Sequence, residues 1–161
     1  IMPQKFLKIK NRNRFRFLKN AKNKFYSLAK ASDVRCNHAC IIFNRRTGEI
    51  IAEGHNYHYH KKCVGTWTKV GSCSMHAEED AYRKFLKIYK RHKHRPNDIF
   101  DLIVVRKEPN GKPGYKMSKP CSKCKSKLQK LKKKSLLGKI YHSIDSSSDE
   151  LSDSIVEDEC C

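Results

Sequence analysis

The stretch Ser74-Met-His-Ala-Glu-Glu-Asp80 marks the start of the clearest helix in the sequence. Apolar residues follow at helical spacing, with lysines on the other faces; they are Ala77, Ala81, Phe85, Ile88 and Tyr89. Pro96 ends the pattern, because proline cannot continue a helix. The sequence therefore predicts an amphipathic helix that begins at His76.

Strand-like runs lie on both sides of this helix. Short apolar runs rich in β-branched residues predict strands over 39–43, 49–53, 99–105 and 139–143. Helical spacing predicts two further helices over 17–31 and 121–134, whereas residues 55–75 are expected to form a loop. This order favours an α/β domain in which helices pack on a sheet.

A second fragment, Ser118-Lys-Pro-Cys-Ser-Lys-Cys124, places two cysteines one turn apart at a predicted helix start. Two thiolates and one imidazole suit zinc, and a catalytic zinc site keeps its fourth position open for water. His76, Cys121 and Cys124 supply that ligand set from two helix starts. Because unpaired backbone N–H groups lie there, we also expect the pKa of these cysteines to be lowered.

Glu78 lies two residues after His76, close to the expected metal without being one of its ligands. In hydrolytic deamination, zinc-bound hydroxide attacks the ring carbon that carries the amino group. A nearby carboxyl group takes the proton of the water, protonates the ring nitrogen and delivers a proton to the departing ammonia. The position of Glu78 predicts this proton-shuttling role.

A C-x-x-C pair also occurs in structural zinc knuckles and in redox pairs. A knuckle would need a fourth ligand, and the sequence contains no second C-x-x-C to provide it. A redox pair would need neither the H-x-E motif nor the buried strand between the two fragments. The order H-x-E, strand, P-C-x-x-C therefore favours the zinc deaminase interpretation.

On these motifs, residues 20–143 resemble the cytidine/deoxycytidylate deaminase superfamily, nearest its deoxycytidylate deaminase-like branch. Gly54-His-Asn56 and Arg35-x-x-x-Ala39 are similar to motifs of that branch. The resemblance implies a three-layer α-β-α cytidine-deaminase-like fold, with a mixed sheet of four to five strands and helices on both faces. It further implies zinc at His76, Cys121 and Cys124, proton transfer by Glu78, and substrate contacts from Asn56 and Ala77.

The predicted loop over 55–75 carries further candidate residues. Trp67 either stacks on a substrate base at the pocket mouth or packs over the edge of the core. A second, structural zinc is one interpretation of His58, His60, Cys63 and Cys73. Loop thiols and solvent-facing histidines are the simpler interpretation, because the ligand spacing is not diagnostic. We therefore expect one catalytic Zn²⁺.

Charge is distributed unevenly along the 161 residues, which carry a net +20. Residues 144–161 are rich in serine, contain seven acids and no base, and are expected to form a disordered tail. All 36 lysines and arginines lie before it, in a basic arm over 1–16 and a deaminase-like zinc domain over 17–143. This excess favours a polyanionic partner, although a lysine-rich compositional bias explains it equally well.

Three functions remain open at this point. The first is deamination of a cytosine nucleotide such as deoxycytidylate. The second is deamination of a cytosine or adenosine within RNA or single-stranded DNA, which the basic surface and Trp67 favour. The third is a non-catalytic zinc-containing nucleic-acid-binding protein, against which the carboxyl group of Glu78 counts.

Location and partners follow from composition and from the resemblance. Eight cysteines without an apolar leader, and no run of 18 apolar residues, favour an intracellular protein of the cytoplasm or nucleus without a membrane partner. The resemblance implies a homo-oligomer. Acids that follow serines by three residues within 146–150 and 154–157 suit an acid-directed kinase acting on the tail.

Overall fold

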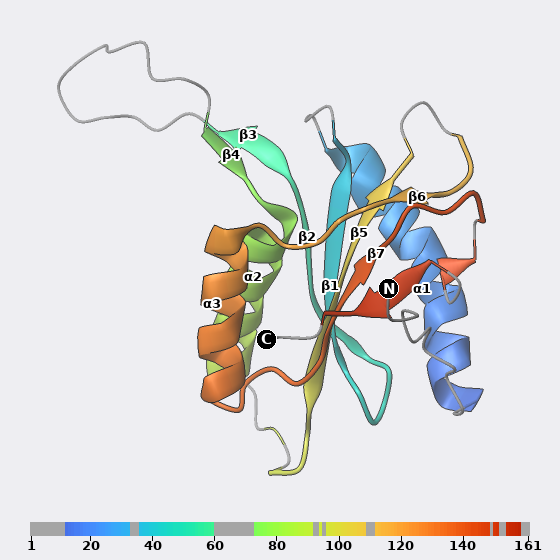
Figure 1. Cartoon of the computed structure of the whole chain (residues 1–161). Helices are drawn as coiled ribbons and strands as arrows, with labels where there is room; N and C mark the ends of the chain where they lie inside the picture. Colours follow the sequence, from blue (N-terminus) through green and yellow to red (C-terminus); the bar gives the residue numbers. More distant parts are fainter. Residues whose placement is uncertain are drawn as a thin grey trace, which may run out of the picture.

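A mixed β-sheet forms the middle of three layers (Figure 1). Helix α1 (Arg12–Ala31) covers one face of the sheet, and helices α2 (Ala77–Arg91) and α3 (Ser122–Lys133) cover the other. The expected three-layer α-β-α arrangement is thus confirmed. The computed structural model describes residues 12–32, 36–59, 73–91, 94, 96–108, 112–148, 150–151 and 154–158.

The sheet has the strand order β2-β1-β5-β7-β8, with β6 paired to β5. Its strands are β1 (His38–Asn44), β2 (Ile50–His55), β5 (Phe100–Lys107), β6 (Tyr115–Lys116), β7 (Ile140–Ser143) and β8 (Ile155–Glu157). Among the described residues, β5 and β7 pair in parallel and the other neighbours are antiparallel. The sheet has six strands where four to five were expected, because β6 and β8 are too short to show a strand pattern.

Two further strands, β3 (Tyr57–Tyr59) and β4 (Cys73–Met75), form a separate antiparallel ribbon. Its register places Tyr57 opposite Met75 and Tyr59 opposite Cys73. The expectation of a loop over 55–75 is therefore wrong at both of its ends. Because β4 ends at Met75, the ribbon leads the chain directly to His76 and the start of α2.

Alternate side chains of the central strand β5 face two different hydrophobic cores. Ile103 and Val105 pack in the core beneath α1, whereas Leu102 and Val104 pack in the core beneath α2 and α3. All four side chains are at most 1% exposed. Because β5 is buried on both faces, its sequence is a continuous apolar run without polar alternation.

Helix α2 approaches the sheet very closely at Gly54. A β-carbon at Gly54 would lie 2.5 Å from both the carbonyl oxygen of Ala77 and the amide nitrogen of Ala81. The spacing requires glycine on the strand, and small residues face it on the helix, where Ala77 and Ala81 are fully buried. The contact fixes the start of α2 over the end of β2.

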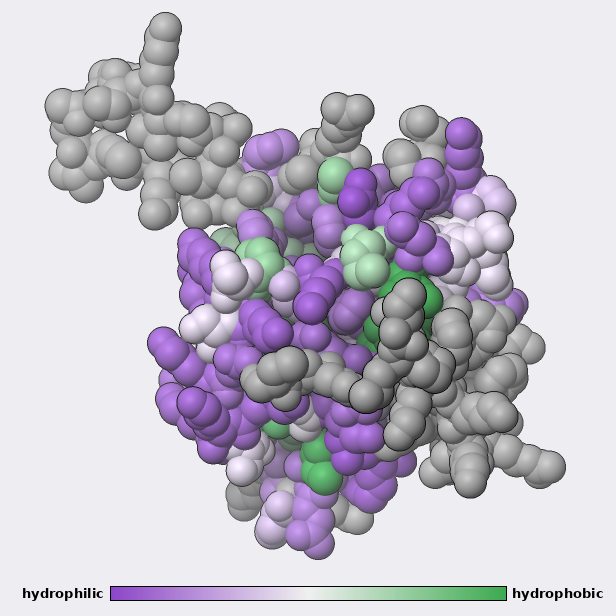
Figure 2. Space-filling model, in the orientation of Figure 1, coloured by the Kyte–Doolittle hydropathy of each residue, from purple (hydrophilic) through white to green (hydrophobic). Residues whose placement is uncertain are grey.

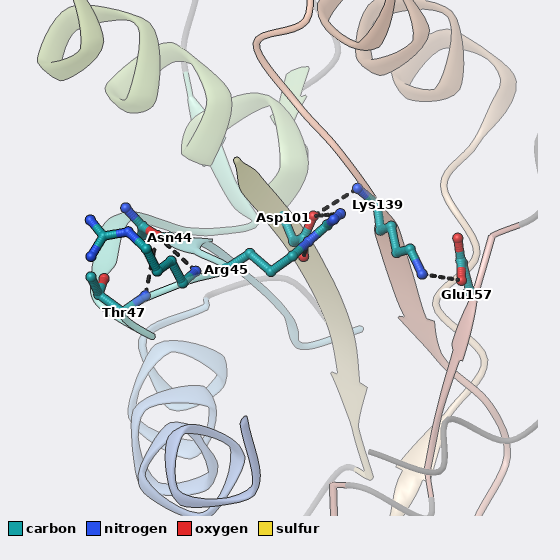
Figure 3. Close-up of polar contacts among 7 residues, drawn as sticks. Asn44, Arg45, Thr47, Asp101, Lys139 and Glu157 are labelled. Atoms are coloured by element: carbon teal, nitrogen blue, oxygen red, sulfur yellow. Dashed lines mark hydrogen bonds and ion pairs between the residues drawn. The ribbon is translucent and has the colours of Figure 1, made fainter. Parts of the chain in front are cut away.

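A partly buried ion pair ties the strands together at the other end of the sheet (Figure 3). The carboxylate of Asp101, which is 1% exposed, accepts hydrogen bonds from Nε and Nη2 of Arg45, each at 2.8 Å. It also accepts one from the backbone N–H of Lys139 at 2.8 Å, and the ammonium of Lys139 lies 3.5 Å from the carboxylate of Glu157. The β1–β2 turn, β5, β7 and β8 are therefore linked through this pair.

The C-terminal segment packs on the sheet over residues 144–148, 150–151 and 154–158, which corrects the expectation of a disordered tail there. Residues 149, 152–153 and 159–161 of the expected tail lie outside the described part of the chain. Strand β8 pairs with β7, and Leu151 and Ile155 join the α1 core at 2% and 1% exposure. The hydroxyl of Ser154 donates to the carbonyl oxygen of Glu150 at 2.9 Å. The expectation failed because it averaged composition over the segment, whereas a few apolar residues and a free sheet edge are sufficient to order it.

Two related expectations also change. Helix α1 begins at Arg12, so residues 12–16 of the expected arm belong to the helix, and residues 1–11 lie outside the described part of the chain. Ser154 is fully buried, so a kinase would reach it only after β8 separates from β7. Among the described residues, no helix is long and apolar enough to cross a bilayer.

Replacing Gly54 with alanine is expected to lower the free energy of unfolding by about 1–3 kcal/mol, the usual cost of overpacking. The added methyl group meets backbone atoms of Ala77 and Ala81, which cannot rotate away as a side chain would. Urea unfolding measures the effect, with Glu53→Gln on the same strand as the control. Equal midpoints for the two variants would contradict the close approach.

Replacing Ile155 with alanine tests the ordered tail. We expect a loss of about 2–5 kcal/mol in unfolding free energy, because the substitution leaves a cavity in the α1 core. Ser147→Ala, at an exposed position of the same segment, is the matched control and should change little. A truly disordered tail would make the two variants indistinguishable in a denaturant titration.

Candidate metal centre

Three side chains from two helix starts converge at one end of the sheet. The Nδ1 atom of His76 lies 3.6 Å from the sulfur of Cys121 and 3.3 Å from the sulfur of Cys124. The three potential ligand atoms lie within 4.8 Å of one another, and they form the one such group among the described residues. The predicted ligand residues are therefore brought together, with Nδ1 as the imidazole donor.

The spacing of these atoms fits a tetrahedral zinc ion. Zinc bonds of about 2.3 Å to sulfur and 2.0–2.1 Å to nitrogen, at tetrahedral angles, separate the two ligand atoms by about 3.5 Å. The two observed nitrogen–sulfur distances lie on either side of that value. One nitrogen and two sulfur donors, with a fourth position left to water, is a ligand set of catalytic zinc sites.

Both fragments place their first ligand immediately before a helix. His76 precedes Ala77, the first residue of α2, and its carbonyl oxygen accepts the N–H of Asp80 at 3.0 Å. Cys121 is the N-cap of α3, and its carbonyl oxygen accepts the N–H of Lys125 at 2.8 Å. The first turn of α3 then carries Cys124 inward, where it is 2% exposed. The expected helix-start placement is confirmed.

A buried serine pair attaches the cysteine loop to the sheet. The hydroxyl of Ser118 donates to the carbonyl oxygen of Val104 on β5 and accepts the backbone N–H of Ser143 on β7, both at 2.8 Å. The hydroxyl of Ser143 donates to the carbonyl oxygen of Lys116 at 2.6 Å and accepts the N–H of Arg106 at 3.0 Å. These bonds hold the chain three residues before Cys121 against two strands.

Charged side chains hold the start of α2 in place. One oxygen of Glu79 accepts from Arg83 at 2.8 Å on the same helix and from Lys127 of α3 at 2.9 Å. The carboxylate of Asp80, which is 6% exposed, accepts from Lys84 at 2.9 Å and from the backbone N–H of His55 at 3.3 Å. The helix that carries the imidazole is thereby tied both to the helix that carries the thiols and to β2.

Glu78 is 5% exposed, at the start of the same helix turn. Burial raises the pKa of its carboxyl group, while a hydrogen bond from its own backbone and the nearby His76 oppose that change. Burial likewise raises the pKa of the Cys124 thiol, with contributions from the charges of Glu78 and Cys121. This corrects the expectation of a lowered pKa for Cys124, because desolvation and like charges outweigh the helix start.

A third cysteine lies close behind the site. Cys40 on β1 is fully buried, and burial together with the charges of Glu78, Cys124 and Asp80 raises its pKa. These groups thus crowd potential negative charge into one small volume. A divalent cation offsets that repulsion, which is a second reason why the cluster suits a metal. The sequence pattern identified Cys40 only as a residue of a buried strand.

Asn56, predicted to contact substrate, is engaged in a network beside the site. Its Oδ1 atom accepts the hydroxyl of Ser32 at 2.6 Å and the backbone N–H of His38 at 2.9 Å. Its Nδ2 group donates to the carbonyl oxygen of Cys36 and lies 3.5 Å from Nδ1 of His38. Through these hydrogen bonds, Asn56 fixes the chain that leads into β1. Its amide group can contact a substrate only by giving up one of these hydrogen bonds.

The network also defines the environment of His38, which the sequence did not single out. Burial lowers the pKa of this imidazole, a hydrogen bond with the carbonyl oxygen of Cys36 opposes that shift, and the charges of Arg106 and His76 lower it further. The β1–β5 register places His38 directly opposite Arg106. Two basic side chains thus stand together close to the metal site.

The remaining predicted residues occupy different surroundings. Ala77 is fully buried and belongs to the core beneath α2. Cys73 lies in β4 and His58, which is exposed, lies in β3 opposite Ser74. Trp67, His60 and Cys63, like Arg35, fall outside the described residues, so their predicted roles stay predictions.

The chain matches no protein-family model and no curated protein. Among solved structures it is similar to the dCMP deaminase from the cyanophage S-TIM5 in its apo form, with 17% identity, a TM-score of 0.48, and coverage of 81% of this chain and 85% of that chain. It is also similar to that enzyme in complex with dCMP and dUMP, with 19% identity, a TM-score of 0.43, and coverage of 80% and 79%. At these values the likeness concerns only the path of the chain.

Replacing Ser118 with alanine is expected to cost about 1–3 kcal/mol of unfolding free energy, because the N–H of Ser143 loses a partner in a buried place. The loosened loop should also release zinc more readily, as measured by competition with a chromogenic chelator. Ser126→Ala, at an exposed position of α3, is the control. Unchanged stability and unchanged zinc retention would show that the serine pair does not position the cysteines.

Proposed function

We propose that the protein is a zinc-dependent hydrolytic deaminase that acts on the amino group of a cytosine nucleotide. The observation that carries the proposal is the buried carboxyl of Glu78 beside a nitrogen and two sulfur donors with zinc-like spacing. A structural zinc site has no use for a buried carboxyl that is not a ligand. The deoxycytidylate substrate is proposed from the sequence resemblance.

The residues of the site divide the reaction between them. Zinc held by His76, Cys121 and Cys124 would supply Lewis-acid activation of a water molecule at neutral pH. Glu78 accepts a proton from the attacking water and passes it to the ring nitrogen. It then takes the second proton of the same water and delivers it to the amino group, which leaves as ammonia while the ring carbon forms a C=O bond. Its burial keeps bulk water from competing for these transfers.

A second substrate class is deamination of a base within a single-stranded nucleic acid. The observation that favours it is the excess of lysine and arginine, 36 against 16 acids over the whole chain. The four site residues serve either class, because their proposed roles are to hold zinc and to move protons. A panel of substrates therefore decides between them: deoxycytidylate, and oligonucleotides that contain cytosine or adenosine.

Glu78→Gln should retain zinc and lose ammonia release by roughly 10²–10⁴-fold, the range typical of a lost general acid–base group. Metal analysis and an ammonia assay on the same preparation measure both properties. Glu79→Gln is the matched control, because that carboxylate points to Lys127 and Arg83. An unchanged rate in the Glu78 variant would refute the proposed mechanism, and a wild-type protein that binds no zinc would refute the function.

A further inference from the structure

A groove of about 470 Å³ lies on the face of the sheet opposite the metal centre, between α1 and the end of β5. Helix α1 contributes Lys22, Asn23, Tyr26, Ala29 and Lys30, and the facing wall consists of Asn37, Lys107, Glu108, Lys112 and Pro113. None of these residues takes part in the site described above. The volume falls within the range of pockets that bind small ligands or single polymer units.

The groove is strongly cationic. Four lysines line it against a single acid, Glu108, whose carboxylate already lies 3.3 Å from the ammonium of Lys116 outside the lining. Lys22, Lys30 and Lys112 form no ion pair with any described acid. Lys107 is held by the ring of Tyr115, with its ammonium 4.1 Å from the ring centre. The charges of Lys22, Lys30 and Lys112 are thus available to an anionic ligand.

The lysines of α1 are arranged along a line with an aromatic ring between them. Lys22, Tyr26 and Lys30 are spaced four residues apart and therefore share one flank of the helix. The ammonium-bearing positions at the ends lie about 12 Å apart along the axis, more than one phosphate group spans. Tyr26 is 54% exposed, the most exposed large hydrophobic side chain among the described residues.

We propose that this groove binds single-stranded nucleic acid, with the lysines on different phosphates of the strand and Tyr26 stacked on a base. Cations that follow the backbone, with an aromatic ring that accepts any base, are what sequence-tolerant binders of single strands use. A concave groove with a protruding ring suits a strand whose bases are free to stack. A duplex keeps its bases within its own stack.

A membrane is a poorer fit to the same surface. The other exposed large hydrophobic residues among those described are Ile99 and Met117, and neither lines the groove. Figure 2 shows one face of the molecule, on which hydrophilic residues dominate and hydrophobic residues form small separate patches. Among the described residues, the groove therefore offers lysines and no exposed large hydrophobic side chain besides Tyr26, which adds a contact for a base.

The proposal concerns binding and stands whether or not the metal centre is a deaminase. The probe is a fluorescein-labelled single-stranded oligonucleotide of about ten nucleotides, a length within the site sizes of such grooves. Fluorescence anisotropy with the full zinc-loaded chain gives the affinity at several salt concentrations. Lys22→Gln/Lys30→Gln should weaken binding and reduce the slope of log affinity against log salt by about 1.4, which is about 0.7 per lost phosphate contact.

The control removes the same charge from elsewhere. Lys87→Gln/Lys90→Gln alters two exposed lysines of α2, on the other face of the sheet, and should leave the salt slope unchanged. Tyr26→Ala should weaken binding roughly tenfold and Tyr26→Phe should retain it, because phenylalanine still stacks. Lys112→Gln, at an exposed position outside the helix, provides a test that does not alter α1.

Two results would overturn the proposal. Equal losses in the α1 and α2 double variants would show binding to the general positive charge of the protein. The second result is that the wild type and Tyr26→Ala bind the probe with equal affinity and lose it at equal heparin concentrations. That result would show a site for any polyanion. A groove that binds nucleic acid gives loss in the α1 and Tyr26→Ala variants and retention in Tyr26→Phe and in the α2 control.

Discussion

The close approach of α2 to Gly54 is the constraint on which the site depends. Because a side chain has no room there, the helix has one allowed height over β2. Strand β2 is hydrogen-bonded to β1, and β1 to β5, so the position of α2 is fixed relative to these strands as well. The serine pair attaches the cysteine loop to β5 and β7 at the same end. Two ligand fragments 45 residues apart are therefore positioned by one rigid layer.

Acidic groups are buried together at this end of the sheet, whereas the chain as a whole is strongly basic. The protein carries +20, yet the carboxyl of Glu78 and the thiols of Cys40 and Cys124 are buried together, and burial raises the pKa of each. The nearby ammonium groups of Lys84 and Lys127 are occupied by Asp80 and Glu79. Among the described residues, no ion pair joins a side-chain cation to these deeper groups, and a metal ion is the partner that the donor set fits.

The sequence was sufficient where a local pattern matches a local structure. The helix after His76, the apolar run of β5 and the two helix-start fragments follow from spacing alone, and so does the grouping of His76, Cys121 and Cys124. Strands β6 and β8 could not be predicted from spacing, because a strand of two or three residues is defined by the backbone it pairs with. The roles of Ser118 and Asn56 also stayed hidden, since each depends on partners more than ten residues away.

The last residues of β5 connect the two faces of the molecule. Side chains alternate along a strand, so Arg106 follows Leu102 and Val104 on the face of the metal centre, and Lys107 follows Ile103 and Val105 on the face of the groove. The register sets Arg106 beside His38, and Lys107 lines the groove. Cationic side chains thus lead from one face to the other around a single strand end.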